Sequence, residues 1–145
     1  MRCEDIMKRD VECIDPTQPV QEAARRMRDA NIGFLPVCDS SKKVLGAITD
    51  RDIALRVVAA GRDPRSTTAG EVATKQVSPA YPDEPLDEAL EQMAYQQVRR
   101  LPVIEDDRVV GILAQADVVH EVRDKKAGHL VEEISQPRAP ESGLG

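Results

Sequence analysis

The sequence predicts an α/β chain, more narrowly α+β, in which two pseudo-symmetric β-α-β-β-α units pack through their sheets. The first observation is a strand-to-helix turn at 46–52 (GAITDRD), which returns at 111–117 (GILAQAD) with its glycine, apolar pair and final aspartate at the same spacing. The second is a Leu-Pro-Val strand before each turn, at 35–37 and 101–103. The third is size: a lone unit of about 55 to 60 residues has only a marginal core, so the units are expected to share one.

The internal repeat covers most of the chain. Ile6 matches Val72, 66 positions later, and the same shift aligns apolar residues and prolines through the Leu-Pro-Val strands. One residue is then lost from the hairpin turn, so that Gly46 matches Gly111. We therefore expect a first unit with its N-terminal lead-in at 1–62, a second unit at 63–124, and a C-terminal helix and flexible tail at 125–145.

In the first unit, a short strand at 11–14 leads through a proline-flanked turn to a helix. Val20, Ala23, Ala24 and Met27 recur at i, i+3, i+4 and i+7, which is the spacing of one apolar helical stripe. Two apolar segments joined by a short charged turn predict a hairpin, and a second helix closes the unit. The expected ranges are 34–38 and 44–49 for the hairpin and 50–60 for the closing helix.

The second unit repeats this order. Leu86, Ala89, Leu90 and Met93 form the matching helical stripe. A polar segment containing Gly and Pro connects the units at 61–68. The remaining expected elements are helical lead-ins at 4–7 and 69–73, a short strand at 76–78, a hairpin at 100–104 and 109–113, a closing helix at 115–123, a further helix at 127–134 and a frayed tail at 136–145.

The composition excludes several partners. A formal net charge of -6 and a pI near 5.0 oppose nucleic-acid binding, and Phe34, Tyr81 and Tyr95 are too few aromatic residues for a base-stacking platform. The N-terminus is acidic where a signal peptide would be apolar, and no apolar run is long enough to span a bilayer. We expect a cytoplasmic protein without a nucleic-acid or membrane partner.

Catalytic and metal chemistry is not predicted. The sequence contains no Ser-His-Asp order, no Gly-x-Ser-x-Gly, no P-loop and no Rossmann glycine pattern, so we do not expect an enzyme. Its three cysteines, Cys3, Cys13 and Cys38, form no CxxC or CxxH spacing. We therefore predict neither a metal site nor a required cofactor.

The tandem units, each with Leu-Pro-Val and the first with Gly-x-x-Thr-x-x-Asp, resemble a pair of cystathionine-β-synthase (CBS) domains, an arrangement called a Bateman module. The resemblance covers about residues 3–123. Without an attached catalytic or channel domain, the chain is similar to stand-alone two-CBS proteins. Among these it resembles bacterial stress and hypoxic-response proteins at 59–64 (AAGRDP) and 97–100 (QVRR).

The resemblance implies a regulatory, non-catalytic module that binds AMP, ADP, ATP, S-adenosylmethionine or NAD between its CBS motifs. It also implies a homodimer whose conformation signals to an effector protein that the sequence does not identify. In the family, the motif aspartate takes the ribose diol, the threonine assists, and basic residues before the Leu-Pro-Val strand hold phosphate. These roles fall on Asp52, on Thr49 and on Arg99 with Arg100. Family geometry suggests Ile14 and Pro16, or Val77 and Pro82, as apolar walls for adenine.

Each of these residues also has a simpler interpretation. A carboxylate can accept both donors of a ribose diol, which suits Asp52, but Thr49-x-x-Asp52 is equally a helix capping box. Two guanidinium groups suit a phosphate ester, but adjacent arginines at the start of a surface strand are often solvated or salt-bridged. Ile14 is β-branched in a strand and fits a protein core. The sequence leaves both interpretations open.

The second copy of the turn predicts a weaker site. Ala114 replaces the hydroxyl, which leaves Asp117 beside Gln115, with Val77 as an apolar neighbour. The first copy in turn has Ile32-Gly33-Phe34 where the second has its arginines. We therefore expect few phosphate contacts from the first half, which favours a ligand with one phosphate or none.

An alternative function is a ligand-free dimerisation module or a redox-responsive stress protein. Cys13 and Cys38 fall near the ends of two extended segments, and neighbouring strands can bring two cysteines to disulfide distance. A reducing cytoplasm favours free thiols instead. For a homodimer, apolar pairs at i and i+4 on the closing helices supply surface. These pairs are Ile53 with Val57 and Val118 with Val122.

Overall fold

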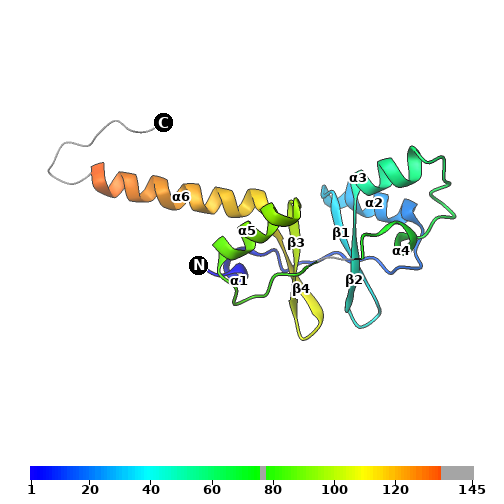
Figure 1. Ribbon diagram of the computed structural model, residues 1–145, viewed down its shortest axis with the longest axis horizontal. Helices are drawn as coiled ribbons and strands as arrows, with labels where there is room; N and C mark the ends of the chain where they lie inside the picture. The colour runs from blue at the N-terminus through cyan, green and yellow to red at the C-terminus, as the bar shows by residue number, and fades with distance from the viewer. Residues whose placement is uncertain (76–77, 135–145) are drawn as a thin grey trace.

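The computed structural model describes residues 1–75 and 78–134 (Figure 1). The predicted contact of Val77 and the predicted tail at 136–145 lie outside the described residues. The elements are α1 (Cys3–Ile6), α2 (Val20–Ala30), β1 (Phe34–Cys38), β2 (Val44–Thr49), α3 (Asp50–Ile53), η1 (Ala54–Val58), α4 (Ala69–Val72), α5 (Leu86–Gln96), β3 (Arg100–Glu105), β4 (Arg108–Ala114) and α6 (Gln115–Ile134).

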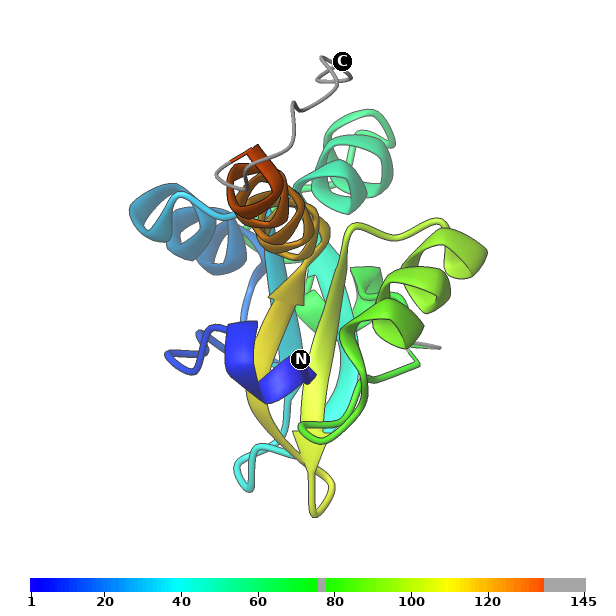
Figure 2. The same cartoon turned by 90° about the vertical axis from the view of Figure 1, so that its left-hand side faces the viewer.

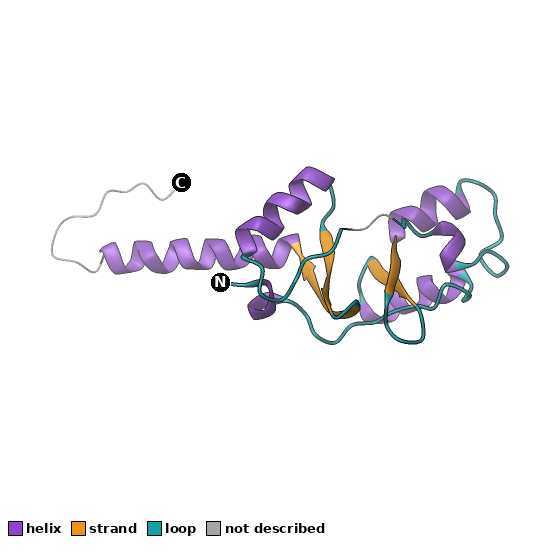
Figure 3. Cartoon of the chain, turned by 60° about the horizontal axis from the view of Figure 1, so that its bottom comes forward, coloured by secondary structure: helices purple, strands orange, loops and turns teal. Residues whose placement is uncertain are grey.

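Two antiparallel hairpins, β1-β2 and β3-β4, form the centre of the molecule, and the helices lie on either side of them (Figure 3). Seen end-on, one hairpin lies behind the other (Figure 2). Phe34, Ala47 and Ile112 bury their side chains together where the hairpins meet, with Val11 and Ile32 packed against them. The two units therefore pack through their sheets, as the sequence predicts.

The expected leading strand of the first unit is reduced to a single bridge, and most of the strand expected at 76–78 lies outside the described residues. Ile14 donates its N–H to the carbonyl of Pro36 (3.0 Å) and accepts from the N–H of Cys38 (2.9 Å), in parallel register with Val37. Ala80 makes the corresponding bridge to Val103. The predicted strand at 11–14 is wrong in extent because the rung before Ile14 would need an N–H from Pro36 of β1, which proline lacks.

Three of the four residues in each predicted helical stripe are buried, whereas Ala24 is exposed and Leu90 is half-buried. In α2, Val20, Ala23 and Met27 face the first core, and the corresponding residues of α5 face the second. Both helices end at a residue in the left-handed region, Asn31 (φ 53°) and Gln97 (φ 57°), whose N–H returns to the last turn. This sharp reversal delivers the chain directly into the next strand.

The closing helices differ from the prediction in two ways. The helix expected at 50–60 is α-helical only in α3 and continues as the π-helical η1, where Ala59 donates to the carbonyl of Ala54 at 2.9 Å. The two helices expected at 115–123 and 127–134 are one continuous helix, α6, which extends beyond the body of the molecule (Figure 1). No proline or glycine interrupts the sequence at 124–126, so nothing ends the helix there.

Each lead-in packs in the core of the other unit. α1 contributes Cys3 and Met7 to the second core, whereas α4 contributes Ala69 and Val72 to the first. After α1, Lys8 pairs with Ile112 of β4. Grouping α1 with the unit at 1–62 therefore follows chain order but not packing, and the boundaries at 62 and 124 stay a prediction.

The crossed lead-ins explain the glycine of the repeated turn. After α4, Thr74 exchanges both backbone hydrogen bonds with Ala47 of β2, at 2.9 Å each. A Cβ on Gly46 would then lie 2.6 Å from the carbonyl oxygen of Thr74, and one on Gly111 would lie 2.6 Å from Sδ of Met7. Only glycine lets the incoming backbone approach this closely.

The apolar pairs predicted to extend the dimer surface are placed differently. Val57 and Val118 are fully buried in the two cores, and Ile53 packs against the first core, so these three side chains do not supply surface. Val122 is 40% exposed. The exposed apolar side chains on η1 are instead Leu55 and Val58.

Candidate functional site

A cleft of about 760 Å³ lies between the strand-to-helix turn of the first unit and the helix-to-strand segment of the second. Its wall combines the start of β1, the end of β2 with α3, Thr74, and the segment from the end of α5 to the start of β3. The lining residues are Gly33, Phe34, Ala47, Thr49, Asp50, Arg51, Asp52, Thr74, Gln96, Gln97, Val98, Arg99 and Arg100. Four residues predicted for the nucleotide site, Thr49, Asp52, Arg99 and Arg100, are thus brought into one cleft.

Hairpin register places these residues. Phe34 pairs with Thr49 and Arg100 with Ala114, so each hairpin has its first and last residues side by side at the cleft end. The helix that follows each hairpin is hydrogen-bonded, through its first residue, to the residue before that hairpin. Asp50 donates its N–H to the carbonyl of Gly33 (3.1 Å), as Gln115 does to that of Arg99 (2.8 Å).

Thr49 and Asp52 form the capping box that was the simpler interpretation of their spacing. The N–H of Asp52 donates to Oγ1 of Thr49 at 3.1 Å, and the N–H of Thr49 donates to Oδ2 of Asp52 at 3.0 Å. The other carboxylate oxygen, Oδ1, lies 4.0 Å from Nε of Arg56, and the Asp52 side chain keeps 17% of its surface exposed. A carboxylate oxygen has more than one acceptor position, so capping leaves Asp52 able to accept from a ligand.

Arg99 and Arg100 lie on the opposite wall. Arg99 is exposed and Arg100 half-buried. Among the residues that the structure describes, no ion pair and no side-chain hydrogen bond involves either guanidinium group. Their donors are therefore available to an anionic ligand, and the salt-bridged interpretation finds no carboxylate partner in the described part of the chain.

The predicted adenine walls do not line this cleft. Ile14 is 1% exposed and lies in the first core, because its bridge to Val37 points the side chain inward. Pro16 lines a separate hollow of about 480 Å³ beside Gly70. Apolar surface in the cleft comes from residues that the sequence analysis missed, and these are Phe34, Ala47 and Val98. Phe34 stands next to the Leu-Pro-Val motif and Ala47 stands next to the glycine of the repeated turn. This adjacency was the signal that could have identified them as cleft residues.

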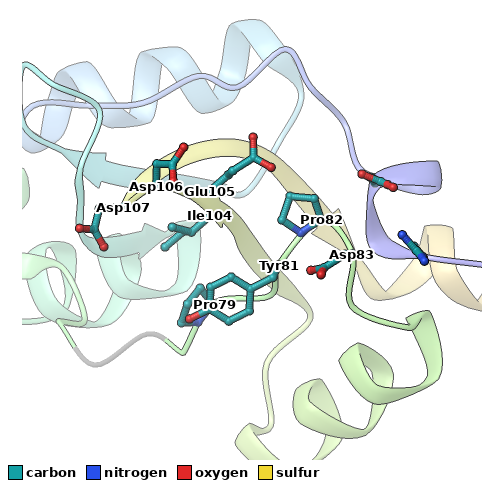
Figure 4. Close-up of a pocket in the computed structure, with 10 residues that line it drawn as sticks. Pro79, Tyr81, Pro82, Asp83, Ile104, Glu105, Asp106 and Asp107 are labelled. Carbon is teal, nitrogen blue, oxygen red and sulfur yellow. The ribbon is translucent and has the colours of Figure 1, made fainter.

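The second copy of the turn is half-buried in the first turn of α6 and does not line the cleft. Among the described residues, no side-chain hydrogen bond involves Gln115 or Asp117, and Ala114 has no hydroxyl with which to cap the helix. Pro82 lies elsewhere, in a hollow of about 630 Å³ that is also lined by Tyr81 and by acidic side chains of the β3-β4 turn (Figure 4). Gln115 and Asp117 line none of these hollows, and Val77 lies outside the described residues, so the weaker second site stays a prediction.

The cysteine pair lies near the far end of β1 from the cleft. Sγ of Cys38 lies 3.2 Å from Sγ of Cys13, and both residues are free thiols. The hydrogen bond from the Cys38 thiol lowers the pKa of Cys13, and the nearby charge of Lys42 lowers that pKa further. The same hydrogen bond and burial raise the pKa of Cys38. Burial in the second core raises the pKa of Cys3 to about 11.

The described residues contain neither a metal-binding cluster nor a helix that could cross a membrane. Within 1–75 and 78–134, no three His, Cys, Asp or Glu residues gather closely enough to hold a metal ion. No helix in the described part of the chain is both long enough and apolar enough to cross a membrane.

Comparison with known proteins gives extensive matches. A family model described as CBS domain matches residues 3–59 and 69–124. Hypoxic response protein 1 of Mycobacterium tuberculosis (strain CDC 1551 / Oshkosh) is 37% identical over 135 residues, which cover 93% of this chain and 94% of that protein. CBS domain-containing protein YhcV of Bacillus subtilis (strain 168) is 38% identical over 132 residues, or 90% and 93% of the two chains.

Solved structures show the same architecture. The crystal structure of hypoxic response protein I with two coordinated zinc ions superposes with a TM-score of 0.77 at 38% identity, over 83% of this chain and 98% of that one. The CBS domain pair of protein MJ0100, in complex with 5-methylthioadenosine and S-adenosyl-L-methionine, superposes with a TM-score of 0.74 at 30% identity, over 86% and 98%.

Proposed function

The chain belongs to the CBS domain family as a tandem pair, and on that basis we propose that it is a non-catalytic regulatory module that binds an adenosine-containing ligand. The family match and the solved CBS pairs confirm the resemblance and the α+β fold that the sequence predicts. The ligand is AMP, ADP, ATP, S-adenosylmethionine or NAD. It binds in the 760 Å³ cleft, and binding changes the conformation of a cytoplasmic homodimer that an effector protein reads.

One observation carries the proposal: a carboxylate suited to a ribose diol and two unpaired guanidinium groups face one cleft from opposite units. Asp52 offers Oδ1 to the diol beside Thr49, and Arg99 with Arg100 offers forked donors to phosphate. The ligand complex of the MJ0100 pair supports adenosine chemistry in this fold.

Isothermal titration calorimetry with the five ligands at millimolar concentration tests the proposal. We expect at least one to bind, and we expect Arg99→Gln with Arg100→Gln to weaken a phosphate-bearing ligand while leaving adenosine itself unaffected. Mass spectrometry of small molecules released from purified protein identifies the cognate ligand. If none of the five binds wild-type protein, the proposed function is wrong.

A second candidate function rests on the thiol pair. With their sulfurs 3.2 Å apart, Cys13 and Cys38 are close enough to form a disulfide after a small adjustment, as in a redox-responsive stress protein. The similarity of the chain to hypoxic response protein 1 is consistent with such a role. Non-reducing peptide mapping of freshly folded protein tests it, because both cysteines would then escape alkylation unless a reductant is added first.

A further inference from the structure

The two ends of the cleft have matching backbones but opposite charges. In each unit, the residue before the hairpin accepts a hydrogen bond from the first residue of the helix that follows the hairpin. Gly33 accepts from Asp50, and Arg99 accepts from Gln115. In the second unit this places an arginine beside a neutral glutamine. In the first unit it places a carboxylate beside a residue without a side chain. The two units therefore share the same backbone geometry here but differ in charge.

The Asp50 carboxylate lies directly against Gly33. A Cβ on Gly33 would lie 2.6 Å from Oδ2 and 2.9 Å from Cγ of Asp50, so the carboxylate occupies the space that a side chain at position 33 would need. Its other oxygen, Oδ1, accepts from the N–H of Arg51 at 2.8 Å, which fixes its orientation. No ion pair among the described residues includes Asp50, so its negative charge is not neutralised by a partner.

This charge limits what the cleft can hold. Three arginines and two aspartates line it, which is a formal charge of +1. One phosphate between Asp52 and the arginine pair is matched by two guanidinium groups. Of the lining arginines only Arg51 then remains to match a further phosphate, and Asp50, the residue before it, repels the added negative charge.

Building on the adenosine-ligand function above, we propose that Asp50 is a specificity-determining residue that restricts the cleft to nucleosides with at most one phosphate. Asp50 acts by repulsion, and Gly33 is the position that lets its carboxylate lie in the wall. The cognate ligand class is therefore a nucleoside monophosphate or an uncharged or cationic nucleoside, and nucleoside triphosphates are rejected.

The test compares AMP with ATP by calorimetry without divalent cations, which would neutralise the triphosphate. Wild-type protein should bind AMP more tightly than ATP. Asp50→Asn keeps the shape and removes the charge, so the preference for AMP should fall on the order of ten-fold. Asp50→Glu keeps the charge and should keep the preference. Asp87→Asn, at an exposed acid in the first turn of α5 outside the cleft lining, controls for net charge.

Three outcomes overturn the role of Asp50 while leaving the adenosine site in place. They are wild-type protein that binds ATP at least as tightly as AMP, Asp50→Asn with an unchanged preference, and Asp87→Asn that lowers the preference equally. A protein that binds no adenosine ligand overturns both this role and the proposed function. A second readout is ionic strength, because raising the salt concentration should shrink the effect of Asp50→Asn by screening the exposed carboxylate.

Discussion

Asp52 combines a structural role and a binding role in one carboxylate. Oδ2 closes the capping box at the start of α3, while Oδ1 faces Arg56 and the cleft. The guanidinium of Arg56 also donates to the carbonyl of Val72 at 2.9 Å, so it links the first turn of this helix to α4. A substitution at Asp52 is therefore expected to change both folding stability and ligand affinity.

Asp52→Ala should lower the free energy of unfolding by about 1 kcal/mol through loss of the cap. It should also weaken ligand binding by about 1.5 to 3 kcal/mol, the scale of a charge-assisted hydrogen bond. The chain offers a matched control, because Thr68 and Glu71 form the same reciprocal box at α4 but do not line the cleft. Glu71→Ala should lose stability alone. Chemical denaturation and calorimetry on both variants separate the two effects, and equal losses of affinity would contradict a direct role for Asp52.

The thiols of the first unit should react unequally. Because the pKa of Cys13 is lowered and that of Cys38 is raised, Cys13 carries more thiolate and should alkylate first. Cys3, whose pKa burial raises to about 11, should react last. Iodoacetamide labelling followed by mass spectrometry between about pH 6 and 9 measures the order. A lowered pKa means that the Cys13 thiolate persists as the pH falls below the ordinary pKa of a thiol. Reaction at Cys13 should therefore decline only at lower pH.

At the scale of single elements, the sequence predicted the bounds of those elements that depend only on neighbouring residues. The bounds of β1 and β2 agree with the prediction because apolar segments and a charged turn define a hairpin without reference to the rest of the chain. The π turn at Ala54–Val58 was not predicted, because the residue types there equally suit an α-helix. Ile14, which family geometry suggested as an adenine wall, lies in the first core, in agreement with the simpler interpretation of a β-branched strand residue.

α1 offers a test at this scale, because the structure places it far from the unit that follows it in sequence. Deleting residues 1–7 removes Cys3 and Met7 from the second core. Hydrogen exchange should therefore rise in β3 and β4, with a smaller change in β1 and β2. Exchange that rises mainly in the first hairpin would contradict the crossed packing. Loss of two buried side chains should also lower the free energy of unfolding by several kcal/mol, about 2 to 5 for each large residue.

On the whole molecule, exposed apolar side chains mark the surface for the proposed homodimer. On η1, Leu55 and Val58 are 52% and 71% exposed, and on α6 Val122 is 40% exposed. Scattered apolar residues are normal, but these lie on the helices that close the two units. Of the four side chains that the sequence predicted to supply this surface, Val122 is exposed, Ile53 is half-buried, and Val57 and Val118 are buried, so the dimer surface stays a prediction.

Light scattering at about 100 μM, above the range of weak association, should give a mass near twice the 16.0 kDa of the monomer. Val58→Asp should shift the mass toward the monomer, because a charge in an apolar interface is costly to desolvate. Tyr95 is 91% exposed on α5, so Tyr95→Asp serves as the control and should remain dimeric. A monomeric wild type would exclude the dimer.

The crossed lead-ins have a consequence for a unit produced by itself. A single unit would carry a lead-in shaped for a different core and would lack the one that completes its own. Two copies of that fragment could solve both problems by exchanging lead-ins, each covering the glycine of the other's strand-to-helix turn, which is a reciprocal swap with two-fold symmetry. The connector at 61–68 makes this exchange intramolecular. In the intact chain the exchange partner is always at hand, so formation of the cleft does not depend on protein concentration.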